Sequence, residues 1–168
     1  IGEIATVRTG LVAARKKKSL ISNQSYQYKL LNLKCISNDG HIEQNELEQY
    51  EISEKLKDDY LTQSGDILIR LSTPYTVVLI NRKELCGIVI PSHFAVIRVN
   101  REIVTPEYVF WQIRRDENRI TMMQNSSGGA AFATISSGLI ANLDILLLPL
   151  SSQKKIGDLM ILTEREQD

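Results

Sequence analysis

The chain has 168 residues and carries 20 Lys and Arg against 20 Asp and Glu, so its formal net charge is zero. This length fits one domain, or one domain with an appendage, and an apolar fraction of 43% is enough for a normal core, which excludes global disorder. No apolar run approaches the roughly 18 residues that a membrane span needs. No secretory signal is visible either, so we expect a cytoplasmic protein.

Charge is distributed unevenly along the chain. Residues 1–34 carry a net charge of +6 and residues 35–66 a net charge of −7, whereas residues 67–125 and 126–168 carry +3 and −2. Zero total charge argues against a nucleic-acid-binding protein, but a basic segment beside an acidic one can still focus potential at a phosphate backbone. The four consecutive basic residues 15–18 are therefore either a solvated loop or part of a DNA-binding surface.

The first half of the chain has the patterns of a β-rich protein with an acidic connection. Residues 1–7 form a short apolar start, residues 28–36 alternate loosely like a strand, and residues 38–40 (Asn-Asp-Gly) are a turn signal. Residues 42–60 are acidic and polar, which predicts a loop with one or two helical turns around residues 53–60. After the turn at residues 64–66, strands are predicted at residues 67–71, 76–81, 87–90 and 94–99. The last of these is apolar on both faces, so we expect it inside a sheet or barrel-like layer.

Helical patterns dominate the second half. Thr105 as N-cap, followed by Pro106 and Glu107, predicts a helix with a wide apolar stripe, broken near residues 116–118 and resumed to residue 124. A loop at residues 125–129 and a short helical turn begun by Ser136 or Ser137 follow. Residues 143–148 are predicted as a buried strand, and residues 151–152 (Ser-Ser) as the cap of a last helix.

The sequence contains none of the common catalytic or nucleotide-binding signatures. It has no GxxxxGK[ST], GxGxxG, HExxH or GxSxG motif. Ser92 and His93 are adjacent on a predicted strand, where neighbouring side chains point to opposite faces and would not readily bond each other. Cys35 and Cys86 belong to no CxxC pair, so we expect small buried hydrophobic residues rather than zinc ligands. We therefore expect no catalytic residue, no metal and no cofactor.

Five stretches, taken in order, resemble the target recognition domain of type I restriction-modification specificity subunits. They are the opening IGEIATVRTGL of residues 1–11, LTQSGDILI of residues 61–69 with its "GD-apolar-apolar" signature, PSHFAVIR of residues 91–98, TPEYV of residues 105–109, and the closing stretch of residues 135–149 followed by QKKI at residues 153–156. Together they cover nearly the whole chain. The closing motif of the family usually has Glu-Gln, whereas this chain has Ser152-Gln153.

The resemblance implies an α+β fold, with a mixed, strongly curved or barrel-like β-sheet, flanking helices and a C-terminal helix. It implies a target recognition domain over residues 1–150 and the start of a conserved dimerisation helix over residues 151–168, in a single-domain or half-subunit form. Such a domain does no chemistry. It reads one half of a bipartite site in double-stranded DNA and docks subunits that methylate adenine; a restriction subunit and a homodimer through the last helix are left open.

Residues that would contact DNA are sought among mobile cations and small polar loop residues, because phosphates need positive charge and base edges need side chains that reach a groove. The candidates lie in three segments: Arg15, Lys16, Lys17 and Lys18; Arg70, Ser72, Thr73 and Tyr75; and Asn125, Ser126, Ser127 and Gly128. An ion pair within the sheet is an equal alternative for Arg70, as is packing at the rim for Tyr75. On the last helix, the stripe Ile156, Leu159 and Met160 is predicted to meet a partner helix.

Two other functions stay open at this point. The chain could be an assembly scaffold or decoy for modification subunits that does not bind DNA. It could also be a β-rich enzyme with an unfamiliar site, which a deep pocket with convergent polar groups of shifted pKa would favour.

Overall fold

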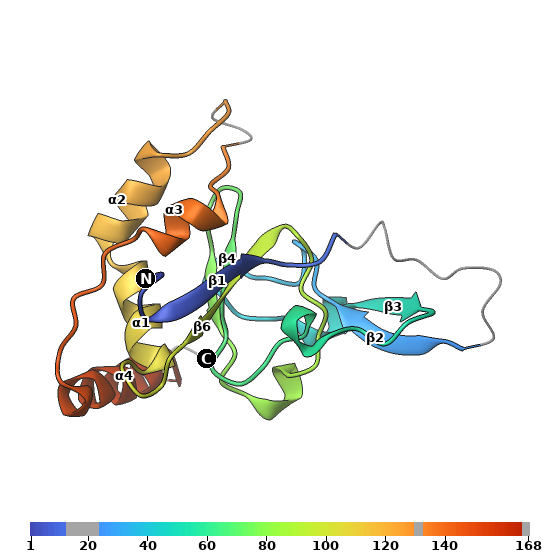
Figure 1. Ribbon diagram of the computed structural model, residues 1–168, viewed down its shortest axis with the longest axis horizontal. Helices are drawn as coiled ribbons and strands as arrows, with labels where there is room; N and C mark the ends of the chain where they lie inside the picture. Colours follow the sequence, from blue (N-terminus) through green and yellow to red (C-terminus); the bar gives the residue numbers. More distant parts are fainter. Residues whose placement is uncertain (13–23, 130–132, 166–168) are drawn as a thin grey trace.

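The computed structural model describes residues 1–12, 24–129 and 133–165, and a four-stranded antiparallel sheet forms its centre (Figure 1). The strands are β1 (Ala5–Thr9), β4 (Ile67–Arg70), β5 (Val77–Leu79) and β6 (Phe94–Val99), in the order β1-β6-β4-β5. The register places Ile97 of β6 opposite both Val7 and Ile67. The strand that is apolar on both faces is therefore an interior strand, as predicted.

A second, two-stranded antiparallel sheet lies at the opposite end of the molecule from the helices (Figure 1). It pairs β2 (Tyr26–Leu30) with β3 (Glu48–Ile52). Short 3-10 helices lie in the connections: η2 (Gln44–Glu46) before β3, η3 (Asp58–Tyr60) after β3, and η4 (Lys83–Leu85) after β5. The strand predicted at residues 87–90 is reduced to isolated bridges, in which Val89 meets Leu30 and Leu61.

Four helices lie on the other side of the central sheet: α1 (Pro106–Arg114), α2 (Asp116–Gln124), α3 (Ser137–Ala141) and α4 (Leu150–Arg165). Two predicted caps are confirmed. The Thr105 hydroxyl accepts from the Tyr108 N–H at 3.3 Å, and the Ser136 hydroxyl accepts from the Leu139 N–H at 3.1 Å. The break after α1 falls at Arg115, whose backbone is extended. No helix in the described ranges is long and apolar enough to cross a membrane.

Both faces of the central sheet are buried, which places apolar cores on either side of it. Ile67, Ile69 and Ala95 face α1, whereas Leu68 and Phe94 face the loops on the other side. A smaller cluster lies beneath β2 and β3 and is built from Leu11, Tyr50, Ile52, Leu56 and Val89. Burial on both faces explains why β4, β5 and the first half of β6 read as continuous apolar runs, whereas the outer strand β1, with two exposed threonines, does not.

The α+β class is confirmed, but the barrel-like, mixed sheet is not. The described strands form two separate antiparallel sheets, with no closed or strongly curled barrel among them. The two outer strands, β1 and β5, do not pair with each other, and other segments of the chain cover their free edges. At β5, a Cβ on Gly40 would lie 2.4 Å from the Val77 carbonyl oxygen, so the loop of residues 38–42 covers that edge; β1 contacts α3. Edges covered in this way need no closure.

The buried strand predicted at residues 143–148 is also wrong. This segment is an irregular connection along the helices, in which Leu146 and Leu147 are 61% and 51% exposed. The Tyr108 hydroxyl donates to the Leu146 carbonyl at 2.6 Å, so a side chain replaces the sheet ladder as its partner. The last helix begins at Leu150, so Ser151 and Ser152 lie in its first turn rather than capping it.

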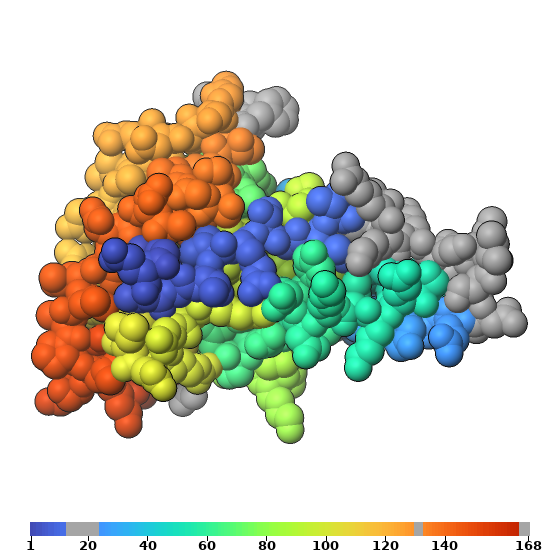
Figure 2. Space-filling model, viewed as in Figure 1, coloured from blue at the N-terminus to red at the C-terminus, as the bar shows by residue number. Residues whose placement is uncertain are grey.

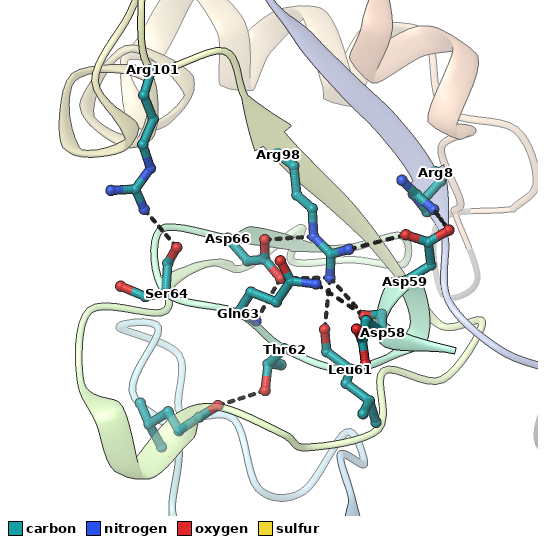
Figure 3. Close-up of polar contacts among 11 residues, drawn as sticks. Arg8, Asp58, Asp59, Leu61, Thr62, Gln63, Ser64, Asp66, Arg98 and Arg101 are labelled. Carbon is teal, nitrogen blue, oxygen red and sulfur yellow. Dashed lines mark hydrogen bonds and ion pairs between the residues drawn. The ribbon is translucent and has the colours of Figure 1, made fainter. Parts of the chain in front are cut away.

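The turn at residues 64–66 is held by a buried ion pair (Figure 3). Gly65 has a φ of 87°, a backbone conformation that favours glycine. The next residue, Asp66, is 2% exposed and accepts from Arg98 Nε at 2.8 Å, from Arg98 Nη2 at 3.1 Å and from the Gln63 N–H at 2.9 Å. Both carboxylate oxygens of Asp66 are thus hydrogen-bonded within the fold. The "GD" signature therefore has a structural role, which is to connect this turn to β6.

The same guanidinium continues outward to the surface. Arg98 Nη2 donates to the Leu61 carbonyl at 2.6 Å, and Arg98 Nη1 lies 3.5 Å from Asp59, which also pairs with Arg8 at 2.6 Å. Figure 3 shows these groups converging between β1, β6 and the acidic segment. The network therefore attaches the acidic segment to the two adjacent strands of the central sheet.

Removing the buried acid should destabilise the fold far more than removing the exposed one. Asp66→Ala removes the buried partner of Arg98 and leaves it only the longer 3.5 Å pairing with the exposed Asp59, which should lower the free energy of unfolding by about 3 kcal/mol. Asp59→Ala removes a carboxylate whose side chain is 54% exposed and should cost about 1 kcal/mol or less. Urea unfolding followed by circular dichroism measures both variants, and equal losses would contradict the assignment of the central joint to Asp66.

The two thiols should differ in reactivity. Cys35 is fully buried, and burial raises the pKa of its thiol, whereas Cys86 is half-buried. Because the thiolate is the reactive form, an aromatic disulfide reagent at mildly alkaline pH should label Cys86 first. A Cys86→Ser chain should then lose the fast phase and a Cys35→Ser chain should keep it; the reverse pattern would contradict the burial of residue 35.

Candidate nucleic-acid interface

The predicted contact residues fall into three groups in the structure. Arg15, Lys16, Lys17 and Lys18 lie outside the described residues. The other two segments follow β4 and α2, which are far apart in the chain. Their geometry decides whether they can form one surface.

The loop after β4 presents small polar groups and one partly exposed cation. Arg70 ends the strand and donates from Nε to the Ser72 hydroxyl at 3.0 Å. Among the described residues Arg70 has no ion pair, so the alternative of a salt bridge within the sheet is not what the structure has. Thr73 is exposed and Ser72 is half-buried. Tyr75 is 7% exposed and packs in the core beneath the helices, which agrees with a packing role for its ring.

The loop after α2 is the more exposed of the two. Asn125, Ser127 and Gly128 are exposed, and Gly128 has a φ of 105°. The amide of Asn125 donates to the Thr121 carbonyl at 2.9 Å, and the Ser126 hydroxyl donates to the Met123 carbonyl at 2.8 Å. Figure 2 shows the end of α2 and this loop projecting at the upper edge of the molecule.

Backbone hydrogen bonds from residues 133–135 join the two loops. Ser127 and Thr134 exchange N–H to carbonyl bonds of 2.8 and 2.9 Å. On the other side, the Thr73 N–H donates to the Ala133 carbonyl at 3.2 Å, and the Ile135 N–H donates to the Leu71 carbonyl at 2.8 Å. The residues 70–75, 125–129 and 133–135 therefore form one continuous region, which we call the joined-loop surface.

Two further arginines, which are not among the contact residues predicted from the sequence, lie beside this surface. A hollow of about 310 Å³ is lined by Pro74, Tyr75, Arg114 and Arg119, among others. Arg114 pairs with Glu164 of α4 and stacks on Phe110, whereas Arg119 has no ion pair within the described ranges. Arg114 is the last residue of α1, whereas Arg119 belongs to α2. The change of direction at Arg115, between the two helices, lets both side chains line the same hollow.

The stripe predicted for a partner helix is divided by the fold. Ile156 and Met160 pack against the core of this same chain. Leu159 is 65% exposed, and Leu162, one turn further, is 56% exposed. Beyond the first turn of α4, the exposed leucines among the described residues are therefore Leu159 and Leu162, of which the sequence pattern identified one.

No arrangement typical of an active site is found within the described ranges. Burial raises the pKa of Cys35 and of Tyr50, while a backbone hydrogen bond and then the charge of Arg115 lower the pKa of Glu117. These three groups lie in two different apolar clusters and on the exposed start of α2, so they do not converge. Nor do the described His, Cys, Asp and Glu side chains gather in groups of three that could hold a metal ion.

The fold is similar to two solved structures of known systems. One is the HsdS subunit from Thermoanaerobacter tengcongensis, with a TM-score of 0.68 and 20% identity. The other belongs to work on complex assembly and conformational transition of the type I R-M system, with a TM-score of 0.70 and 21% identity. The matches cover 99% and 98% of this chain but 41% of each of those chains. A search among curated proteins found no match.

Structural similarity at 20–21% sequence identity shows the fold but not the family. A family model shows the family. The model described as "Type I restriction modification DNA specificity domain" matches residues 1–163. That match contains the "GD" turn, the Thr105-capped helix and the closing helix in one continuous span. The chain therefore belongs to the family of type I restriction modification DNA specificity domains.

Proposed function

We propose that this domain recognises one half of a bipartite site in double-stranded DNA through the joined-loop surface, without catalysing a reaction itself. The observation that carries the proposal is the union of two sequence-distant polar loops by residues 133–135. DNA recognition combines cations for phosphates with small polar groups that reach base edges, and this surface holds both. Arg70 within the surface and Arg119 beside it supply the charge, and Thr73, Asn125 and Ser127 supply the exposed polar groups.

We also propose that the basic residues 15–18 contribute to the same interface, and that α4 docks the subunits that methylate adenine. For α4, the support is the exposed pair Leu159 and Leu162 on a helix whose other face is already buried. An exposed apolar stripe of this kind is typical of a helix that meets another helix. The domain boundary near residue 150, with recognition before it and assembly after it, agrees with the start of α4 at Leu150.

Binding to duplex DNA should be salt-dependent, and Arg70 should contribute to the dependence. Each phosphate contact releases counterions and adds about 0.9 to the slope of log affinity against log salt concentration. Arg70→Ala should therefore weaken binding to a random-sequence pool of duplexes and reduce the slope by about 1 if the contact is to phosphate. Fluorescence anisotropy over a salt series measures both quantities.

Arg82 offers a matched control for the loss of one positive charge. It lies after β5, at the opposite end of that strand from residues 70–75. Arg82→Ala should leave the affinity and slope nearly unchanged. Equal effects of the two substitutions, or wild-type binding that does not respond to salt, would contradict the joined-loop surface as the DNA interface.

Deleting the gene should remove adenine methylation at one bipartite motif of the host genome. Single-molecule methylome sequencing before and after deletion measures this, and complementation with the wild-type gene should restore the same motif. Complementation with Arg70→Ala should restore it only partly. An unchanged methylome, together with assembly of the chain with modification subunits, would favour a scaffold that does not read DNA.

A further inference from the structure

One buried polar side chain connects α4 to the start of α1. Gln153 is 1% exposed and uses both ends of its amide. Oε1 accepts from the Thr105 N–H at 3.0 Å, while Nε2 donates to the Leu148 carbonyl at 2.8 Å and to the Ile103 carbonyl at 3.2 Å. Two segments of backbone, at residues 103–105 and at residue 148, therefore meet at one side chain in the first turn of α4.

These bonds are directional, which distinguishes them from apolar packing. A hydrophobic side chain of similar size could fill the same space while the helix rotated or slid. Gln153 instead bonds one N–H and two carbonyls at partly buried positions, and any rotation of α4 would break these bonds. The start of α4 is thus fixed relative to the capped end of α1.

A second point of contact lies one helical turn further along α4. A Cβ on Gly157 would lie 2.8 Å from the Glu107 Cβ and 3.8 Å from the Tyr108 nitrogen. The absence of a side chain at residue 157 lets the two helices approach closely there. Two contacts one turn apart define a direction, and the pairing of Arg114 with Glu164 holds the far end of α4 along the same line.

The direction of α4 determines where its outward leucines point. With Ile156 and Met160 turned inward, Leu159 and Leu162 face away from the domain. The joined-loop surface is built from the loops that follow β4 and α2, and not from α4. The position of Leu159 and Leu162 relative to this surface therefore depends on the angle between α4 and α1. A small rotation of α4 would move the leucines while the loops stayed in place.

We propose that Gln153 is a positioning residue that sets the direction of α4, and hence the placement of any subunit held by Leu159 and Leu162 relative to DNA on the joined-loop surface. The proposal rests on the proposed function only for the identity of what the helix positions. The orienting role itself concerns the free chain and can be tested without DNA or partner subunits.

The experiment measures the distance between two spin labels in the full 168-residue chain by double electron–electron resonance. One label is attached at Thr6→Cys on β1 and the other at Asp158→Cys on α4, both of which are exposed positions. Cys86→Ser removes the half-buried native thiol from every labelled chain, while the buried Cys35 is kept. Gln153→Met keeps the length of the side chain without its hydrogen bonds, and Gln153→Glu keeps an acceptor but loses both donors.

Both variants should shift or broaden the distance distribution, while helix content and the salt-dependent binding of the free chain to a random duplex pool stay unchanged. Lys154→Ala, at the exposed next residue, should keep the narrow wild-type distribution. An unaltered distribution in Gln153→Met and Gln153→Glu would overturn the proposal. Cooperative unfolding of the whole domain in both variants would overturn it too, because Gln153 would then be a general stabilising residue. If the wild-type chain does not bind duplex DNA at all, that result counts against the proposed function and not against the orienting role of Gln153.

Discussion

The ion pair between Asp66 and Arg98 is the interaction on which the rest of this domain depends. A carboxylate that is 2% exposed is stable only when its oxygens are paired and hydrogen-bonded, and here Arg98 and the Gln63 N–H meet that need. Arg98 belongs to the central strand β6, which pairs with both β1 and β4. The pair therefore fixes the acidic segment against the sheet, and through η3 it fixes the chain that leads from the small β2–β3 sheet.

Local signals in the sequence predicted the elements well wherever the cause of the element was local. Thr105 and Ser136 cap helices because their hydroxyls reach N–H groups three residues ahead, and strand β6 is apolar on both faces because it lies between two cores. The break between α1 and α2 was expected within a residue or so of its position. The caps and the break depend on residues that are close in sequence, and the burial of β6 is visible in its own composition.

The features that could not be predicted depend on partners far away in the chain. The apolar run at residues 143–148 has the composition of a buried strand, but its partners are the Tyr108 hydroxyl and the Asn118 amide rather than another strand. Likewise, nothing local distinguishes Gln153 from the exposed polar residues beside it. The two loops of the joined-loop surface were candidates by composition alone, and only the contacts of residues 133–135 show that they are adjacent.

The motifs that carry the family resemblance are, on this structure, the joints of the framework. The "GD" turn anchors β4 to β6, the Thr105 cap begins α1, and Gln153 of the closing motif connects α4 to that cap. The polar residues proposed to contact DNA belong to none of these motifs. A division of this kind, with a rigid framework and separate recognition loops, is typical of binding domains.

The bonds that unite the two loops have a consequence for how such a domain can change over time. Four of them run from main-chain N–H to main-chain carbonyl, and every residue except proline carries both groups. The Thr73 hydroxyl adds a bond of 3.3 Å to the Ala133 carbonyl, but the four main-chain bonds do not involve the side chains of Asn125 and Ser127, so substitutions at these two positions leave those bonds in place. With the joined-loop surface as the proposed DNA interface, single substitutions there could change the target site while the main-chain bonds between the loops stay in place.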